Sequence, residues 1–153
     1  MIDNQTQKIV VLTPPAAIVD NAAFPTATLD TLGWGYCTIY CVLGATDIAM
    51  AALKVQESDN SGMSGAADIS GLVYGTSTLA DSSITSSLPS ATADNTVFAF
   101  DIPLNGRKRY LDVVATAGDG TAGTYMTVLA LLSRGKEVPN SATERGLAAV
   151  LRA

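Results

Sequence analysis

The sequence predicts an all-β chain that folds as a single antiparallel β-sandwich. Strand-length segments with alternating apolar and polar residues, such as residues 53–57 and 109–116, are separated by short runs of Gly, Asp and Ser. Residues 125–132 are apolar on both faces, which is typical of a strand deep in a sandwich or beneath a partner. A chain of 153 residues is long enough for one core without disulfide or metal staples.

Residues 1–25 are expected to form an extended N-terminal arm. A strand is possible at residues 8–12, but the adjacent prolines Pro14 and Pro15 cannot sit inside a central strand, so the segment should follow a sheet edge or a surface. The sandwich domain is expected to span residues 26–135. Its strands are predicted at residues 26–31, 36–43 (ended by Gly44), 53–57, 97–102, 109–116 and 125–132.

Three segments lack a clear strand pattern. Residues 45–52 suit one helical turn as well as an extended segment. Residues 58–95 are rich in Ser, Thr, Ala and Gly and, apart from the strand-like Leu72-Val73-Tyr74, are expected to be a long irregular excursion. Residues 136–153 are expected to form a C-terminal tail. Ser141 followed three residues later by Glu144 matches a capping box, so this tail is predicted to be either a short helix or extended.

The composition indicates a protein that lies against other protein chains. Hydrophobic residues make up 48% of the sequence and charged residues only 15%, against about a quarter charged in ordinary soluble domains. Part of the apolar surface is therefore expected to be covered by other chains. The net charge of −5 argues against direct nucleic-acid binding, which needs clustered Lys and Arg in excess. Neither a signal peptide nor a membrane span is predicted.

The absence of histidine argues against an enzyme, because histidine is the commonest general base and the commonest metal ligand. Residues 59–62 and 118–120 gather oxygen-bearing side chains that could suit a hard cation. Neither run has the spacing of an EF-hand, so both are interpreted as turns. We therefore predict no catalytic residue, no cofactor and no metal site.

Cys37 and Cys41 are the only cysteines, and both fall on one expected strand. Four residues of a strand span roughly 13 Å, whereas the Cα atoms of a disulfide lie within about 7 Å of each other. The two cysteines therefore cannot be bridged. We expect both to be small buried hydrophobic residues, which fits assembly in a reducing cytosol.

Two local features are candidates for protein contact. The basic cluster Arg107-Lys108-Arg109 lies at a turn and is either solvated or in contact with an acidic surface, such as that of a neighbouring copy. Trp34, between two glycines, is either a core residue or an exposed anchor at an interface, and the core interpretation is favoured.

The order of these segments resembles that of small virion structural proteins of tailed bacteriophages. The resemblance covers roughly residues 26–135 and implies a β-sandwich decoration or cement protein, bound outside the major capsid shell and often trimeric. It implies no catalytic residues. The segments that carry it are Leu53-Lys54-Val55-Gln56-Glu57-Ser58-Asp59, Asp68-Ile69-Ser70-Gly71, Lys108-Arg109-Tyr110-Leu111 and Gly118-Asp119-Gly120-Thr121, followed by the apolar last strand.

The sequence and this resemblance together predict a jelly-roll-like sandwich that serves as a phage capsid decoration protein. The expected partners are the major capsid protein and further copies of this chain, as a homotrimer. The chain would be made in the bacterial host cytoplasm and would end on the capsid surface. Alternatives are a head-tail connector or tail protein, and a carbohydrate-binding head-fibre or lectin-like module. The candidate interface residues are Ile2, Ile9, Val10, Val11, Leu12, Trp34, Arg107, Lys108, Arg109, Leu147, Val150 and Leu151.

Overall fold

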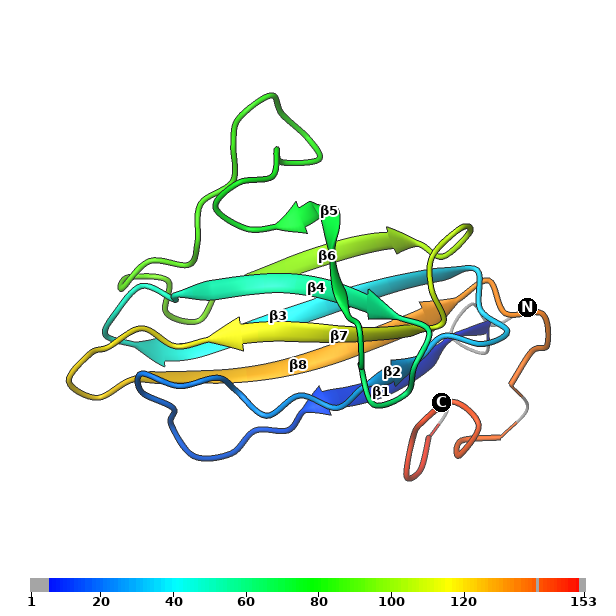
Figure 1. Ribbon diagram of the computed structural model, residues 1–153. Coiled ribbons are helices and arrows are strands. Elements are labelled where there is room, and N and C mark those ends of the chain that lie inside the picture. The colour runs from blue at the N-terminus through cyan, green and yellow to red at the C-terminus, as the bar shows by residue number, and fades with distance from the viewer. Residues whose placement is uncertain (1–5, 140, 152–153) are drawn as a thin grey trace.

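The computed structural model describes residues 6–139 and 141–151, which form a two-layer β-sandwich (Figure 1). The all-β, antiparallel prediction is confirmed. Within the described ranges there is no α-helix, and hence none long and apolar enough to cross a membrane. The strands are β1 (Lys8–Thr13), β2 (Leu29–Asp30), β3 (Tyr36–Thr46), β4 (Ala52–Ser58), β5 (Ala67–Val73), β6 (Val97–Pro103), β7 (Tyr110–Thr116) and β8 (Thr124–Ser133).

Each layer is a four-stranded antiparallel sheet. One has the order β1-β8-β3-β6 and the other β2-β7-β4-β5. The first strand therefore pairs with the last, the second with the seventh, the third with the sixth and the fourth with the fifth. Further pairs, β3 with β8 and β4 with β7, complete the two sheets. The chain is wound as one long folded hairpin, with both ends of the described chain at the same end of the sandwich (Figure 1).

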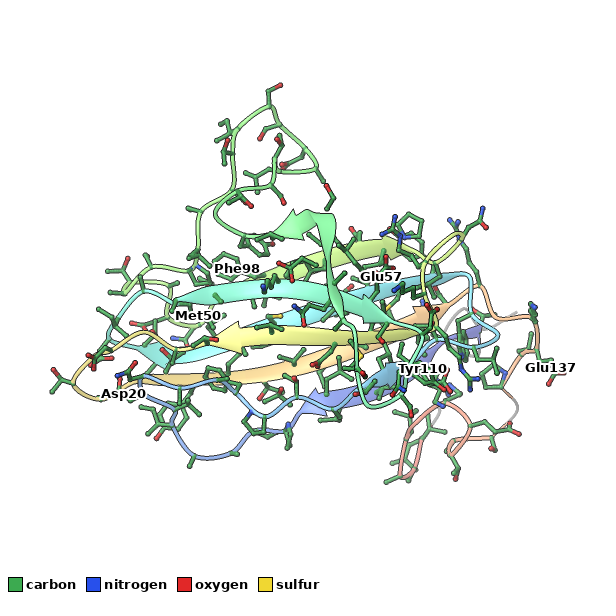
Figure 2. All side chains as sticks on the ribbon, in the orientation of Figure 1. Asp20, Met50, Glu57, Phe98, Tyr110 and Glu137 are labelled. Carbon is green, nitrogen blue, oxygen red and sulfur yellow. The ribbon has the colours of Figure 1, made fainter. Side chains whose placement is uncertain are left out.

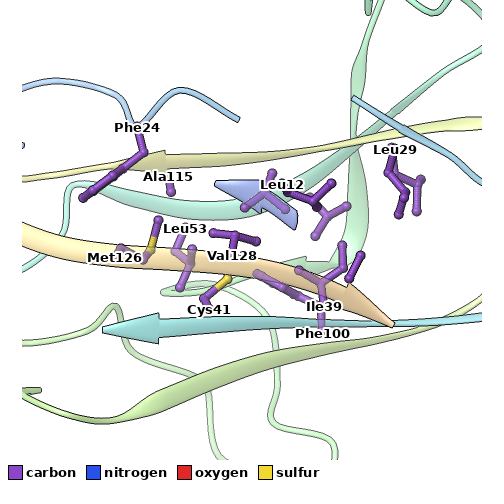
Figure 3. Packing of buried hydrophobic residues seen from close by; sticks show 14 of the residues in the cluster. Leu12, Phe24, Leu29, Ile39, Cys41, Leu53, Phe100, Ala115, Met126 and Val128 are labelled. Carbon is purple, nitrogen blue, oxygen red and sulfur yellow. The ribbon is translucent and has the colours of Figure 1, made fainter. Parts of the chain in front are cut away.

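The core forms because alternate residues of each strand point inward. In β3, Cys37, Ile39 and Cys41 are fully buried, while Thr38 and Tyr40, which lie between them, are partly exposed. The predicted inward set of β7 is confirmed, since Leu111, Val113 and Ala115 are buried. Figure 3 shows Ile39, Cys41 and Ala115 among the side chains packed between the sheets.

β3 is longer than predicted. Gly44 does not end it, and the strand continues to Thr46 through an irregularity in its pairing with β8. A Cβ on Gly44 would stand 3.1 Å from the Cβ of Tyr125, so the missing side chain makes room for Tyr125 instead of stopping the strand. Residues 45–51 form no helical turn.

β5 lies inside the segment that was expected to be irregular. Only Ile69 of this edge strand is buried, so its sequence lacks the apolar alternation by which a strand is recognised. Asp68 holds the strand to β4 through hydrogen bonds from Lys54 (2.8 Å) and Gln56 (2.7 Å). The expected short strand at residues 26–31 is reduced to Leu29–Asp30.

The possible strand at residues 8–12 is present and lies at a sheet edge, as expected, but it belongs to the sandwich and not to a separate N-terminal arm. Residues 8–13 form β1, an integral strand of the sheet, with Ile9 opposite Leu131 and Val11 opposite Leu129. Leu12 is 2% exposed and belongs to the core. The prolines at positions 14 and 15 follow the strand instead of interrupting it, which is where proline is tolerated in a sheet protein.

The C-terminal tail covers the free edge of β1. The predicted capping box is present: Ser141 Oγ accepts a hydrogen bond from Glu144 N–H, and a Glu144 carboxylate oxygen accepts one from Ser141 N–H. The turn ends at Gly146, which has a φ of 75°, and Leu147 N–H donates back to the Ala142 carbonyl. This is a single capped turn and not a helix. The Arg145 carbonyl accepts from Ile9 N–H, so the tail satisfies an edge group.

Candidate interaction surfaces

The outer face of the sheet β1-β8-β3-β6 is apolar. Twelve large hydrophobic side chains are exposed among the described residues, and half of them lie on this face. The half-buried Leu129 and Leu131 and the small Ala99 lie among them. We call this surface the apolar face. Its residues are Ile9, Val11, Tyr40, Val42, Val97, Ala99, Tyr125, Leu129 and Leu131.

The apolar face is continuous across all four strands. Directly opposed residues of neighbouring antiparallel strands have Cβ atoms about 4.5–5.5 Å apart, so each row of the sheet forms one contact surface. The central row runs from Val11 through Leu129 and Tyr40 to Ala99. The rows on either side are Ile9, Leu131, Thr38 and Asp101, and Thr127, Val42 and Val97.

Charge is almost absent from this face. Asp101, on the edge strand β6, is the only charged residue at the outward positions of the four strands. It accepts a hydrogen bond of 2.9 Å from Thr38 Oγ1. At one end of the face the Arg134 guanidinium lies over the Tyr36 ring, 5.2 Å from the ring centroid. The surface is thus one that water solvates poorly.

The outer face of the other sheet is polar. Besides the Asp68 contacts with β4, Thr26 Oγ1 donates a hydrogen bond of 2.8 Å to Asp112. Arg109 binds Asp30 through two nitrogens at 2.8 and 2.6 Å. The hydrogen bond from Arg109 holds the pKa of Asp30 below its usual range. The sandwich is therefore asymmetric, with one face suited to water and the other to protein.

The basic cluster Arg107-Lys108-Arg109 is matched by acids of the same chain. A protein partner would compete with these pairs, which lie at the surface and, apart from the largely buried Glu57, are solvent-exposed. Exposed ion pairs contribute little to stability. An intermolecular role for the cluster remains a prediction. The pairs are Arg107 with Glu57 (3.4 Å), Lys108 with Asp59 (3.5 Å) and Arg109 with Asp30 (2.6 Å). Glu57 and Tyr110, labelled in Figure 2, mark this end of the sandwich, opposite Asp20.

The remaining candidate residues divide between the core and the surface. Trp34 is half-buried and packs against the core, as favoured, and Val10 does the same. Leu147 is half-buried, whereas Val150 and Leu151 are exposed, Leu151 by 97%. Ile2 lies outside the described residues.

Asp47 organises the loop between β7 and β8. Its carboxylate accepts hydrogen bonds from the N–H groups of Thr121 (2.7 Å), Ala122 (2.6 Å) and Gly123 (2.9 Å). These bonds lower the pKa of Asp47. Asp20 accepts from Gly120 N–H at 2.8 Å. The carboxylates thus serve the backbone of this loop, and among the described residues no three His, Cys, Asp or Glu side chains gather as a metal site.

Two of the hollows on the described surface adjoin aromatic side chains. One of about 140 Å³ lies between residues 71–80 and β6, beside Tyr74, whose ring packs edge-on against Phe98 and Phe100. Tyr74 also donates a hydrogen bond to the Ala99 carbonyl. The other, of about 260 Å³, adjoins the apolar face and is lined by Pro15, Val42 and Tyr125, among others.

One spacing in the chain is reminiscent of serine chemistry. Ser133 and Lys136 stand three residues apart, as in enzymes that use a Ser-Lys pair. The Lys136 side chain is exposed, whereas a lysine that acts as a base is activated by desolvation or by a neighbouring cation. The spacing by itself therefore supports no catalytic role.

Comparison of the chain with protein-family models, curated proteins and solved structures finds no match. The evidence for an interaction surface therefore comes from the residues of this chain alone. Sequence reasoning selected Ile9 and Val11 but missed Tyr40, Val42 and Val97. The signal that could have found them was the doubly apolar strand at residues 125–132, whose outward Leu129 is directly opposite both Val11 and Tyr40.

Proposed function

We propose that this chain is a non-catalytic structural protein of a tailed-phage virion, of the capsid decoration type. The observation that supports this best is the contrast between the two outer faces of the sandwich. Monomeric proteins rarely expose contiguous apolar patches larger than a few hundred Å². A four-stranded face with a single charged outward residue is suited to permanent contact with protein. The polar outer face of the other sheet is suited to contact with solvent.

We further propose that the sandwich is a jelly roll. The support is the strand order, in which the pairs 1 with 8, 2 with 7, 3 with 6 and 4 with 5 alternate between the two sheets. A long hairpin of four strand pairs that is wound into two sheets gives this arrangement, which is that of a jelly roll. Viral capsid proteins and lectins share the jelly-roll architecture. The strand order thus agrees with a virion role without requiring it.

The proposed contact with the major capsid protein involves the C-terminal tail. Val138, Val150 and Leu151 are exposed at 56%, 43% and 97%, although the turn before Val150 is anchored on β1. An anchored turn followed by free apolar side chains can hold a second protein with little loss of chain entropy on binding. The chain would then be made in the host cytoplasm and would finish on the outer capsid surface.

Replacing Val150 and Leu151 together by Asp should lower the affinity for capsid shells by tenfold or more. Burial of one such side chain contributes about 1.5–3 kcal/mol, and a loss of about 1.4 kcal/mol is already tenfold. The measurement is co-sedimentation of the purified protein with shells that lack it. Truncating residues 1–12 would not be informative, because Leu12 belongs to the core.

The matched control is Ile84→Asp. Ile84 is 67% exposed on the loop between β5 and β6, so its replacement adds one of the tail variant's two negative charges and removes one exposed aliphatic side chain at another place. Wild-type protein that fails to sediment with shells would contradict the proposed function. Equal binding by the tail variant and wild type would contradict the role of the tail alone.

A carbohydrate-binding module is the second candidate, because Tyr40 and Tyr125 are exposed on the apolar face at 38% and 45%. Sugar rings stack on exposed aromatic rings, as cations and other rings do. The aliphatic residues around the two tyrosines favour protein contact instead. A glycan array with specific hits that disappear in Tyr40→Ala would support this alternative.

A further inference from the structure

We infer that the apolar face is covered by a second copy of this chain. The inference deepens the proposed function, because it assigns self-association to one sheet of the sandwich. Two copies that meet through the same face form a two-fold pair, in place of the homotrimer expected from the sequence. It follows from three properties of the face, namely its area, its lack of charge and its shape.

The area of the face approaches that of one side of a stable interface. Its strands have 6, 11, 7 and 10 residues. At about 3.3 Å per residue and about 4.8 Å between strands, they present a flat footprint of roughly 500 Å². The accessible area follows the side chains and is larger than this footprint. A standard interface buries about 800 Å² per partner, so one copy of this sheet laid on another approaches the required size.

The charge distribution allows self-association only on certain surfaces. Each copy carries a net charge of −5, so two copies repel unless they meet where charge is low. The polar sheet carries Asp30, Asp68 and Asp112 on its outer side. On the apolar face the only charged outward residue, Asp101, lies on an edge strand and is hydrogen-bonded to Thr38.

The shape of the face also suits a sheet as its partner. Rows of Val, Leu, Ile and Tyr side chains from two sheets can interdigitate about 10 Å apart, as they do within a β-sandwich. Tyr40 stands in the central row with Leu129 and Ala99 on its two sides. Aromatic side chains near the centre of an interface contribute most to its affinity. Tyr40 is therefore the residue on which association should depend most.

The test measures the mass of the purified protein in the absence of capsid shells by sedimentation velocity. Wild type should sediment at a mass of at least twice the 15.7 kDa of one chain. The single variants Val11→Glu and Tyr40→Glu should sediment as monomers at the same concentration. Each places a carboxylate in the central row, and each position is already exposed, at 50% and 38%, so the fold should be kept.

Ile84→Glu is the matched control and should sediment like wild type. Circular dichroism and the thermal midpoint establish that each variant is folded, and Val97→Glu, on the opposite edge strand, replaces any variant that is not. A monomeric wild type, or an oligomer that survives both variants, overturns the inference. Monomeric wild type together with loss of shell binding in Tyr40→Glu assigns the face to the shell instead. That outcome leaves the proposed function intact and excludes the second copy.

Discussion

Leu12→Ala should lower the free energy of unfolding by about 2–5 kcal/mol, the range for truncating a fully buried leucine. The side chain is 2% exposed and packs in the core between the two sheets. Its strand is fastened on one side to β8 and on the other to the tail, through the bond from Ile9 N–H to the Arg145 carbonyl. Urea unfolding followed by circular dichroism measures the change.

Val11→Ala is the matched control for this prediction. Val11 is the neighbouring residue of the same strand but points to the apolar face and is 50% exposed, so in the monomer its truncation should cost well under 1 kcal/mol. Similar small losses in both variants would mean that residues 8–13 are an arm and not a strand of the sheet.

The stability of the protein should fall steeply with pH above about 8.5, the pKa of an exposed thiol. Burial raises the pKa of Cys37 and of Cys41 to about 12. At a pH between these values the unfolded chain loses both thiol protons and the folded chain keeps them, so proton release favours unfolding. Each cysteine should lower the free energy of unfolding by up to about 1.4 kcal/mol per pH unit over this interval.

The control for the alkaline prediction is the double variant Cys37→Ala and Cys41→Ala. It is less stable at neutral pH because two buried side chains are truncated, but its stability should decline with pH much less steeply than that of wild type. Urea unfolding at a series of pH values from 7.5 to about 10.5 gives both slopes. Parallel slopes would mean that other groups, and not the buried thiols, control the alkaline behaviour.

The sheet core could be predicted from sequence because its signal is local. Residues 109–116 and 125–132 alternate or are apolar throughout, and the structure places both as central strands, β7 and β8. The turns at Gly106 and Gly123 have positive φ, which glycine adopts at little cost. Such features follow from a few neighbouring residues and need no knowledge of the tertiary fold.

The features that sequence reasoning missed, namely β5, the place of β1 in the sheet and the apolar face, depend on contacts between residues far apart in the chain. β5 is held by Asp68 to Lys54 and Gln56 and shows little apolar pattern of its own. The segment of β1 was predicted to be part of an arm, because its pairing with β8 joins residues more than 100 positions apart, which local sequence does not show. The apolar face also depends on such distant contacts. Val11 and Tyr40 belong to one row of the sheet because each lies directly opposite Leu129, on either side of β8.

The number of copies of this chain per phage particle tests the central claim most directly. Quantitative mass spectrometry of purified intact particles gives its molar ratio to the major capsid protein. A decoration protein occupies equivalent sites over the whole shell, so we predict a ratio of the same order as that of the shell protein itself. A ratio corresponding to a single ring would indicate a connector or tail component, and absence from purified particles would contradict a structural role in the virion.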